Sequence, residues 1–400
     1  MANEAFPPAP VHADTKIIPA VSASERYDSN VFFAPASLLA PGTQLSDFVS
    51  SAGAGLEVLH KSRDFEAGLK TRGDVNVYVN NTNLNYLSTV TDGSVKLDKW
   101  VGQFSKGATL SVRDFFQYTP APPGFLTGTR VAPSPDDPFS RGIQQFRSNT
   151  FRNTASIRGS LPIFRGISIQ SSYSYSLFRV GSVLTSTTTA GPAFFNTNVQ
   201  TYSVGPNLRL SRSETIALLY QQSFVNQTRT GQGGPSAYFD TKEVWANYTK
   251  VVPDWTATVR GGIAIIEPLG RAYPVVSLTF LPDPERSTYV QVDLSRKVAP
   301  SYFIVGGALI SNVAQVSVNR RLIKRANLGV IASYANNQVT PDVSQQFNTI
   351  STAVALRYDI TRTVSANLSF TYNYFKSDQP ALSYDFDRYV VSFALGAAWK

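Results

Sequence analysis

The chain has 400 residues, of which 42% are hydrophobic, 12% aromatic and only 16% charged, and its formal net charge is +9. The charged share lies well below the roughly 25% that is typical of soluble globular domains. With no cysteine and two histidines, His12 and His60, the sequence excludes disulfide scaffolds, thiolate metal sites and cysteine nucleophiles, and it leaves little room for a Ser-His-Asp triad.

The chain begins with MANEAFPPAPVHAD, which contains neither the basic n-region nor the apolar h-region of a signal peptide. We therefore expect that a signal peptide has been removed, and we predict that residues 1–15 form an N-terminal tail. Residues 16–400 consist throughout of segments of alternating polarity that are separated by polar turns, which predicts a single domain. No basic run resembles a nucleic-acid-binding arm, so no nucleic-acid partner is expected.

The main signal along the chain is a strict alternation of apolar and polar residues, which gives a strand one apolar and one polar face. It is clearest near the C-terminus, where small polar residues separate Val364, Ala366, Leu368, Phe370, Tyr372 and Tyr374. A soluble β-sandwich and a transmembrane β-barrel both produce such a pattern. Sandwich strands usually have about five or six residues, whereas these segments have about ten or more, enough to cross a bilayer at a tilt.

We therefore predict an all-β fold, a transmembrane antiparallel up-and-down β-barrel. The predicted strands are 16–30, 47–61, 64–80, 84–97, 104–118, 146–161, 165–181, 198–211, 214–227, 238–251, 254–267, 271–281, 286–299, 306–320, 325–338, 345–359, 362–377 and 384–399. These are about eighteen strands, and a closed bacterial barrel requires an even number. The fourth, fifth and fourteenth are the weakest, so a count of sixteen stays open.

The predicted connections alternate between short and long. Short turns fall at 162–164, 212–213, 253, 282–285, 321–324 and 361, and longer connections fall at 119–145, 182–197 and 228–237. If the N-terminal tail is periplasmic, every short turn is periplasmic and every long loop is extracellular, as in outer-membrane barrels. The sequence thus predicts a protein of the bacterial outer membrane, with the lipids of that membrane as partners.

The last strand ends in a pattern that is similar to the signal by which outer-membrane barrels are recognised for insertion. Val391, Phe393, Leu395 and Trp399 share one face, and the run closes on an aromatic residue. Lys400 follows that aromatic residue and departs from the usual pattern. We predict that these four residues form the assembly signal read by the barrel-assembly machinery; the alternative is an ordinary sheet strand.

Strand parity predicts which charged residues line the lumen. They are Glu57, Arg72, Asp74, Arg113, Arg152, Arg158, Arg209, Glu243, Arg260, Asp293, Arg357 and Asp359. Mixed donors and acceptors suit sugar hydroxyls, and arginine forks can hold uronate or phosphate groups. The alternative is that pairs of opposite charge only brace the wall of an aqueous interior.

The proline-rich loop 119–145 could fold inward as a constriction or remain at the surface as a disordered loop. Within it, Asp136 and Asp137 lack the spacing of a calcium loop, so no metal site is predicted. The Gly-rich stretch 231–235 lacks the Lys-Ser/Thr of a phosphate-binding loop. His60 is interpreted as structural, and no cofactor is expected.

Residues 25–32, Glu-Arg-Tyr-Asp-Ser-Asn-Val-Phe, resemble the E-x-Y-x-[DS]-N-[VI]-[FY] opening of the putative β-barrel porin 2 family. Residues 110–118 are similar to the region around the fourth and fifth strands of that family. Its members are encoded with exopolysaccharide or capsule synthesis systems, and some are export barrels that work with a periplasmic co-polymerase and an export protein. The resemblance therefore implies a non-enzymatic channel that exports an exopolysaccharide or capsular polymer with these partners.

Other functions remain as alternatives. A general diffusion porin for small solutes needs the same barrel and no synthesis partners. A barrel sheath for a cytochrome in an electron conduit would take its heme from the partner, because the chain has no C-x-x-C-H motif. An outer-membrane enzyme is disfavoured because neither histidine is predicted near the outer rim, and a structural or adhesive barrel is the remaining alternative. The transported substrate, the gating and the oligomeric state stay open.

Overall fold

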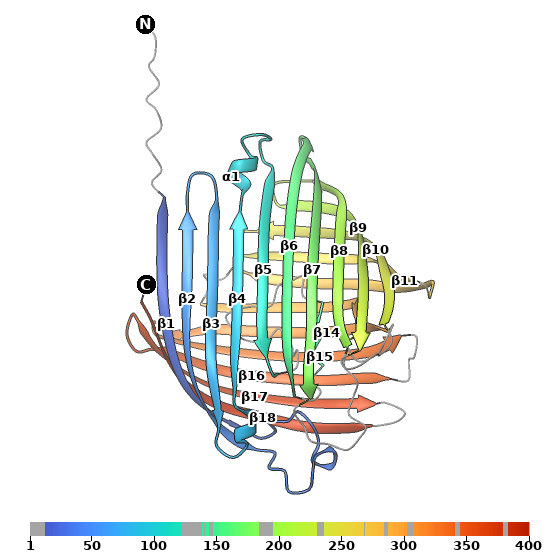
Figure 1. Ribbon diagram of the computed structural model, residues 1–400. Coiled ribbons are helices and arrows are strands. Elements are labelled where there is room, and N and C mark those ends of the chain that lie inside the picture. Colours follow the sequence, from blue (N-terminus) through green and yellow to red (C-terminus); the bar gives the residue numbers. More distant parts are fainter. Residues whose placement is uncertain are drawn as a thin grey trace.

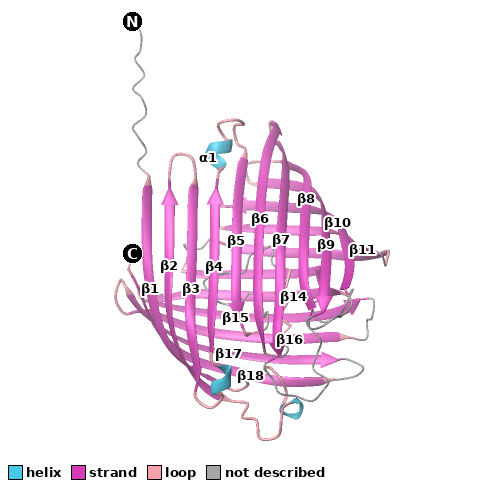
Figure 2. Cartoon of the chain, in the orientation of Figure 1, coloured by secondary structure: helices cyan, strands magenta, loops and turns pink. Residues whose placement is uncertain are grey.

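A computed structural model shows the chain as one barrel of antiparallel strands (Figures 1 and 2). The structure describes residues 13–121, 138–139, 141–143, 147–183, 195–229, 236–267, 269–283, 287–301, 307–340, 345–378 and 383–399. No helix in these ranges is long and apolar enough to cross a bilayer.

Eighteen strands make up the sheet. They are β1 (Asp14–Asp28), β2 (Asp47–Lys61), β3 (Glu66–Tyr78), β4 (Tyr86–Lys96), β5 (Thr109–Thr119), β6 (Ser148–Phe164), β7 (Ile167–Val183), β8 (Phe195–Arg209), β9 (Glu214–Arg229), β10 (Ser236–Val252), β11 (Trp255–Glu267), β12 (Arg271–Pro282), β13 (Thr288–Pro300), β14 (Ala308–Ile323), β15 (Ala326–Thr340), β16 (Gln346–Asp359), β17 (Val364–Asp378) and β18 (Tyr384–Ala398). Short helical turns are η1 (Ala36–Leu38), η2 (Thr82–Leu84) and α1 (Asp98–Val101).

The barrel is closed because β1 pairs with both β2 and β18. Each strand pairs with its neighbours in the chain, so the topology is up-and-down, and Ala398 lies opposite Ala20. The predicted fold class is therefore confirmed, with eighteen strands rather than sixteen. We call the end of the barrel that carries the start of β1 and the end of β18 the turn end, and the opposite end the loop end.

The short turns and long loops named from the sequence lie at opposite ends of the barrel, as predicted, although the long connection 97–108 lies at the turn end and the short connection 268–270 at the loop end. The turn end carries the connections 165–166, 210–213, 253–254, 324–325 and 360–363, and the loop end carries 29–46 and 120–147. Strand boundaries lie within three residues of the prediction with one exception, the start of the fifth strand. The fifth strand was expected from residue 104, but β5 begins at Thr109, because residues 98–108 form α1 and the turns after it at the turn end (Figure 1). Asp98 holds this connection in place, since its Oδ1 accepts a hydrogen bond of 2.8 Å from the amide of Leu110.

Large apolar side chains alternate along the outer face of the barrel and remain exposed. In β18 they are Val391, Phe393 and Leu395, which are 42%, 49% and 43% exposed. The same period occurs along β11 at Val259, Ile263 and Ile265. A soluble protein would bury such a surface, whereas hydrocarbon tails cover it in a bilayer.

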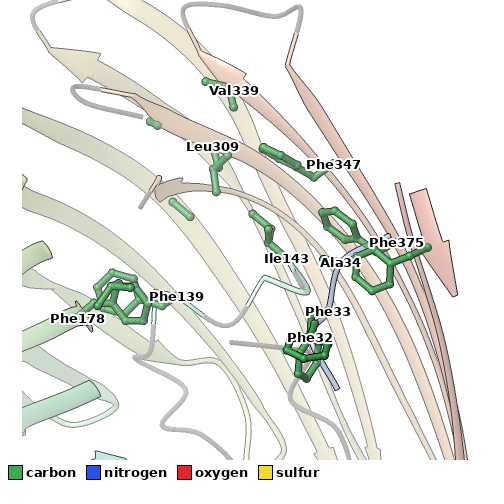
Figure 3. Packing of buried hydrophobic residues seen from close by; sticks show 14 of the residues in the cluster. Phe32, Phe33, Ala34, Phe139, Ile143, Phe178, Leu309, Val339, Phe347 and Phe375 are labelled. Carbon is green, nitrogen blue, oxygen red and sulfur yellow. The ribbon is translucent and has the colours of Figure 1, made fainter. Parts of the chain in front are cut away.

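The loop end of the barrel contains an apolar core in its interior (Figure 3). Part of that core comes from inner-face residues of the strands, such as Val339, Phe347 and Phe375. The rest comes from two connections that turn inward, residues 29–46 and the described residues of 138–147. Val31 and Ile143, one from each, have no exposed surface.

Asp28 and Arg388 form a two-pronged ion pair across the seam between β1 and β18. The Asp28 oxygens lie 2.9 Å from Arg388 Nε and 2.7 Å from Nη2, and the two side chains are only 3% and 16% exposed. Removing one member of a buried pair leaves an uncompensated charge, so we expect Arg388→Met to lower the free energy of unfolding by about 3 kcal/mol. Urea unfolding in detergent, followed by heat-modifiable gel migration, measures this loss.

Two variants control this prediction. Adding Asp28→Asn to Arg388→Met is expected to recover most of the lost free energy of unfolding, because the double variant no longer buries an unpaired carboxylate at residue 28. Arg72→Met breaks a comparable pair with Asp74, but the Arg72 side chain is 55% exposed, so the expected loss is at most about 1 kcal/mol. Equal losses in the single and double variants at the seam would contradict the explanation.

Candidate functional site

A segment of the long connection between β5 and β6 crosses the inside of the barrel; we call its described residues 138, 139, 141–143 and 147 the inner segment. At one wall the ring of Phe139 stacks on Phe178 of β7, with 5.0 Å between ring centroids (Figure 3). At the opposite wall, Asn337 Nδ2 of β15 donates to the carbonyl of Arg141 over 2.9 Å. The loop predicted as 119–145 therefore folds inward in its described part.

Two further features hold the inner segment against β15 and β16. The hydroxyl of Thr349 donates to the carbonyl of Gly142 over 2.6 Å. Gly142 has a φ of 75°, a left-handed conformation that glycine adopts without the strain of a Cβ. Ile143 follows with its side chain fully buried in the apolar core.

Arg147 ties the inner segment to the connection 29–46. Its amide donates to the Phe32 carbonyl over 3.1 Å, and its Nη1 donates to the Val31 carbonyl and to the Tyr78 hydroxyl over 3.2 and 2.7 Å. The guanidinium also lies over the rings of Tyr78 and Tyr86, 4.8 and 5.1 Å from their centroids. Two connections that support each other thus fold into the loop end, over the part of the chain that the structure describes.

The motif at residues 25–32 supplies much of this arrangement. Asp28 pairs with Arg388, and Asn30 donates to the carbonyl of Ala34 over 2.9 Å, which shapes the inward turn. Phe32 accepts the hydrogen bond from Arg147. Glu25 instead lies exposed, opposite Phe393 of β18.

Next to the inner segment, the barrel encloses a cavity of about 160 Å³. Its charged lining comprises Arg141, Glu243, Arg260 and Lys297. Hydroxyl groups from β7 to β10 complete the polar part, at Ser174, Thr201, Ser223 and Thr241. We call this cavity, with three basic groups and one acid, the basic cavity.

Arg260 is fixed by two contacts in the basic cavity. Its Nη2 lies 3.2 Å from Glu243 Oε2 on the neighbouring strand. Its guanidinium carbon lies 3.4 Å from the centre of the Trp245 ring, in a cation–π contact. Lys297 projects from the inner face of β13, and none of the described carboxylates forms an ion pair with it.

Gly262 creates the space that Trp245 needs. The two residues pair across β10 and β11, and a Cβ on Gly262 would collide with the carbonyl of Val244 and with the Trp245 Cβ. We expect Gly262→Ala to cost about 1–3 kcal/mol of unfolding free energy through overpacking, and to displace Trp245 from Arg260. Gly261→Ala is the matched control, because a Cβ there meets open space. Equal unfolding midpoints for the two alanine variants would contradict this account.

Elsewhere on the inner wall, several charged groups form ion pairs. Arg72 binds Asp74 at 2.6 Å, Arg113 binds Asp92 at 2.8 Å, and Arg357 binds Asp359 at 2.9 Å. Glu57 lies 3.6 Å from Lys70, and Asp293 accepts a hydrogen bond from Gln291 over 2.6 Å. The ion pairs neutralise the wall locally, whereas Asp293 keeps its negative charge because its partner Gln291 is neutral.

The remaining residues predicted to line the lumen lie apart from the basic cavity. Arg152 is buried and bonded to Gln117, whereas Arg158 lies exposed on the inner face. Arg209 lies at the turn end and donates to the carbonyls of Ser211 and Arg212, so it supports a turn. Of the predicted set, the structure brings only Glu243 and Arg260 together in the basic cavity.

Sequence reasoning missed Arg141 and Lys297. Lys297 could have been found, because it continues the inner-face parity of Asp293 along β13. Arg141 belongs to an irregular segment in which no periodicity indicates a direction. Asp92, the partner of Arg113, also has lumen parity on β4.

Several other predictions remain as they were. Val391, Phe393, Leu395 and Trp399 lie on the outer face, and their role as an assembly signal stays a prediction. His60 shares a hydrogen bond of 2.8 Å with the Thr15 hydroxyl and lies beside the ring of Phe65. Outside the described residues lie most of the N-terminal tail, the pair Asp136 and Asp137, and the stretch 231–235.

The described ranges contain no group of three or more His, Asp and Glu side chains that could hold a metal ion. The absence of a metal and of a cofactor from the working protein remains a prediction.

A family model described as putative β-barrel porin 2 matches residues 282–396, which confirms the resemblance over β13 to β18; the motifs at 25–32 and 110–118 lie outside the match. No curated protein matches the chain.

Among solved structures, the chain is similar to OccAB3 of Acinetobacter baumannii at 10% identity and a TM-score of 0.47, with 96% of this chain and 99% of that chain covered. The ferric enterobactin receptor PfeA of Pseudomonas aeruginosa gives 9% identity and a TM-score of 0.45, with 98% and 82% covered. The siderophore receptor PirA of Pseudomonas aeruginosa is similar at 9% identity and a TM-score of 0.41, with 96% of this chain and 80% of that chain covered. The closed sheet and the family match together indicate an outer-membrane β-barrel with a porin-like fold.

Proposed function

We propose that this porin-like outer-membrane barrel is a non-enzymatic export channel for a hydrophilic polymer, an exopolysaccharide or capsular chain. The observation that carries the proposal is the inner wall, which offers hydroxyl groups and paired charges. Cross-strand hydroxyl pairs occur on it at Ser172 and Ser203, 2.7 Å apart, and at Ser369 and Ser392, 2.7 Å apart. Sugar hydroxyls can exchange hydrogen bonds with such groups along the length of the barrel.

In this proposal the turn end faces the periplasm and the loop end faces the outside. A periplasmic co-polymerase and an export protein deliver the polymer to the turn end, as the family resemblance implies. The barrel reaches the membrane through the barrel-assembly machinery. The inner segment then acts as a closure near the outer mouth that has to move when polymer passes.

Deleting the gene and measuring surface polysaccharide tests the export function. We expect the polymer to disappear from the surface and to return when the wild-type gene is restored. In this proposal the inner segment closes the resting channel, so the uptake of small hydrophilic solutes is expected to stay the same. Unchanged polymer in the deletion strain would contradict export.

A general diffusion porin for small solutes is the second candidate. The inner segment favours it, because a loop folded into the lumen narrows the passage to dimensions that suit small molecules better than a polymer. In the same deletion strain this alternative predicts normal surface polymer and slower uptake of small solutes.

A further inference from the structure

We infer that the basic cavity binds an anionic group, a carboxylate or a phosphate, carried by the molecule that passes through the barrel. The inference deepens the proposed function, and as a transport site it rests on that function. Of the four charged side chains that line the cavity, Arg141, Arg260 and Lys297 are basic and only Glu243 is acidic. Among the described residues, the lining of the cavity therefore carries more basic than acidic side chains.

The single acid in the cavity is already engaged. Glu243 lies 3.2 Å from Arg260, so this pair is internally balanced. No described carboxylate pairs with Lys297, although it lies inside the barrel among the same residues. A lysine in such a position is stabilised by an anion that binds beside it.

Unsatisfied donors point to the same ligand chemistry. Arg260, which lines the cavity, has a buried Nε without a hydrogen-bond partner among the described residues; Nε1 of Trp245, which packs on Arg260 outside the cavity lining, is buried without one as well. Buried donors without acceptors are costly, and oxygens of a carboxylate or phosphate satisfy several of them at once. The hydroxyls of Thr201, Ser223 and Thr241 line the same cavity; Thr201 and Ser223 share one hydrogen bond of 2.9 Å, so one of these two and Thr241 can donate to the remaining oxygens.

Arg260, one of the basic side chains that line the cavity, is also preorganised for ligand binding. The guanidinium carbon of Arg260 lies 3.4 Å from the centre of the Trp245 ring, and Trp245 packs against Gly262 on the neighbouring strand. The Arg260 side chain is therefore already ordered before a ligand binds. Preorganised groups bind more tightly because less conformational entropy is lost. Arg141 belongs to the inner segment, so an anion in the cavity contacts the closure itself.

Calorimetric titration of the detergent-solubilised full chain tests this site without requiring an open channel. The probes are inorganic phosphate, an oligogalacturonate and a neutral malto-oligosaccharide of equal length. We expect the anionic probes to bind and the neutral probe not to bind. Lys297→Gln should weaken binding roughly tenfold or more, because a charge-assisted hydrogen bond contributes about 1.5–3 kcal/mol. Lys297→Arg should retain most of the affinity.

Lys70→Gln is the matched control, since it removes one positive charge from the inner wall of β3, where Lys70 pairs with Glu57. It should leave anion binding unchanged. Binding of the oligogalacturonate identifies a carboxylate of a polymer as the ligand, and binding of phosphate alone identifies a phosphate group. Absence of binding by both anions, or equal binding by wild type and Lys297→Gln, would overturn the inference. Because titration does not depend on export, normal surface polymer in a deletion strain would refute the proposed function and leave this result in place.

Discussion

Replacing Phe139 and Ile143 by serine is expected to raise the single-channel conductance of the barrel severalfold in planar bilayers. Both side chains are buried in the apolar core, with 1% and 0% of their surface exposed. Truncating large buried apolar side chains costs about 2–5 kcal/mol each, and a buried hydroxyl adds to that cost. The closed position of the inner segment should therefore lose at least about 4 kcal/mol relative to an open one, which shifts the equilibrium by about a thousandfold.

Phe104→Ser is the control for this experiment. Phe104 is 77% exposed at the turn end, outside the lumen, so the same chemical change there should leave the conductance at the wild-type value. The variant with both serines also has to keep its heat-modifiable migration, which shows that the barrel is still closed. A folded double variant with wild-type conductance would show that the inner segment does not limit the passage.

A disulfide between residues 139 and 178 is expected to make the current depend on the redox state. The chain has no cysteine of its own, so Phe139→Cys with Phe178→Cys introduces the only two thiols. The native rings stack with 5.0 Å between their centroids, so the two side chains meet; formation of the bridge, which requires Cα atoms within about 7 Å of each other, is checked by thiol labelling before the current is measured. Oxidised protein should be closed, and reduced protein, which lacks both aromatic anchors, should conduct strongly. The measurement is bilayer current before and after addition of reductant.

Ser369→Cys with Ser392→Cys is the matched pair for that measurement. These serines lie opposite each other on β17 and β18, with their hydroxyls 2.7 Å apart on the inner wall, away from the inner segment. A bridge there joins two strands that are already paired, so reduction should change the current little. If both cysteine pairs respond equally, the effect belongs to the barrel wall and not to the inner segment.

The strands and their faces could be predicted because the membrane imposes a pattern that the sequence must carry locally. Apolar residues such as Leu368 and Phe370 have to alternate with polar ones along each strand, and the last strand has to meet the first. The start of β5 was misplaced because Phe104 and its neighbours continue an apparent strand pattern. The contact between Asp98 and Leu110 that ends it joins residues twelve positions apart.

The candidate site could be predicted only in part. Arg260 and Glu243 lie on regular strands, so parity gives their direction, and the same rule reaches Lys297. Arg141 is placed by contacts that no local pattern contains: the stacking of Phe139 on Phe178 and the hydrogen bond from Asn337, 196 residues further along the chain. Whether a long loop turns inward depends on such distant partners, which explains why both alternatives for residues 119–145 were open from the sequence.

Surface polysaccharide in a deletion strain that carries the 139–178 cysteine pair tests the central claim most directly, because it joins the export function to the inner segment. The account predicts little polymer at the surface while the bridge is oxidised and recovery toward the wild-type amount after a mild reductant is added. The strain that carries the 369–392 pair should export normally in both conditions. Equal surface polymer from the oxidised and reduced 139–178 variant would contradict the account.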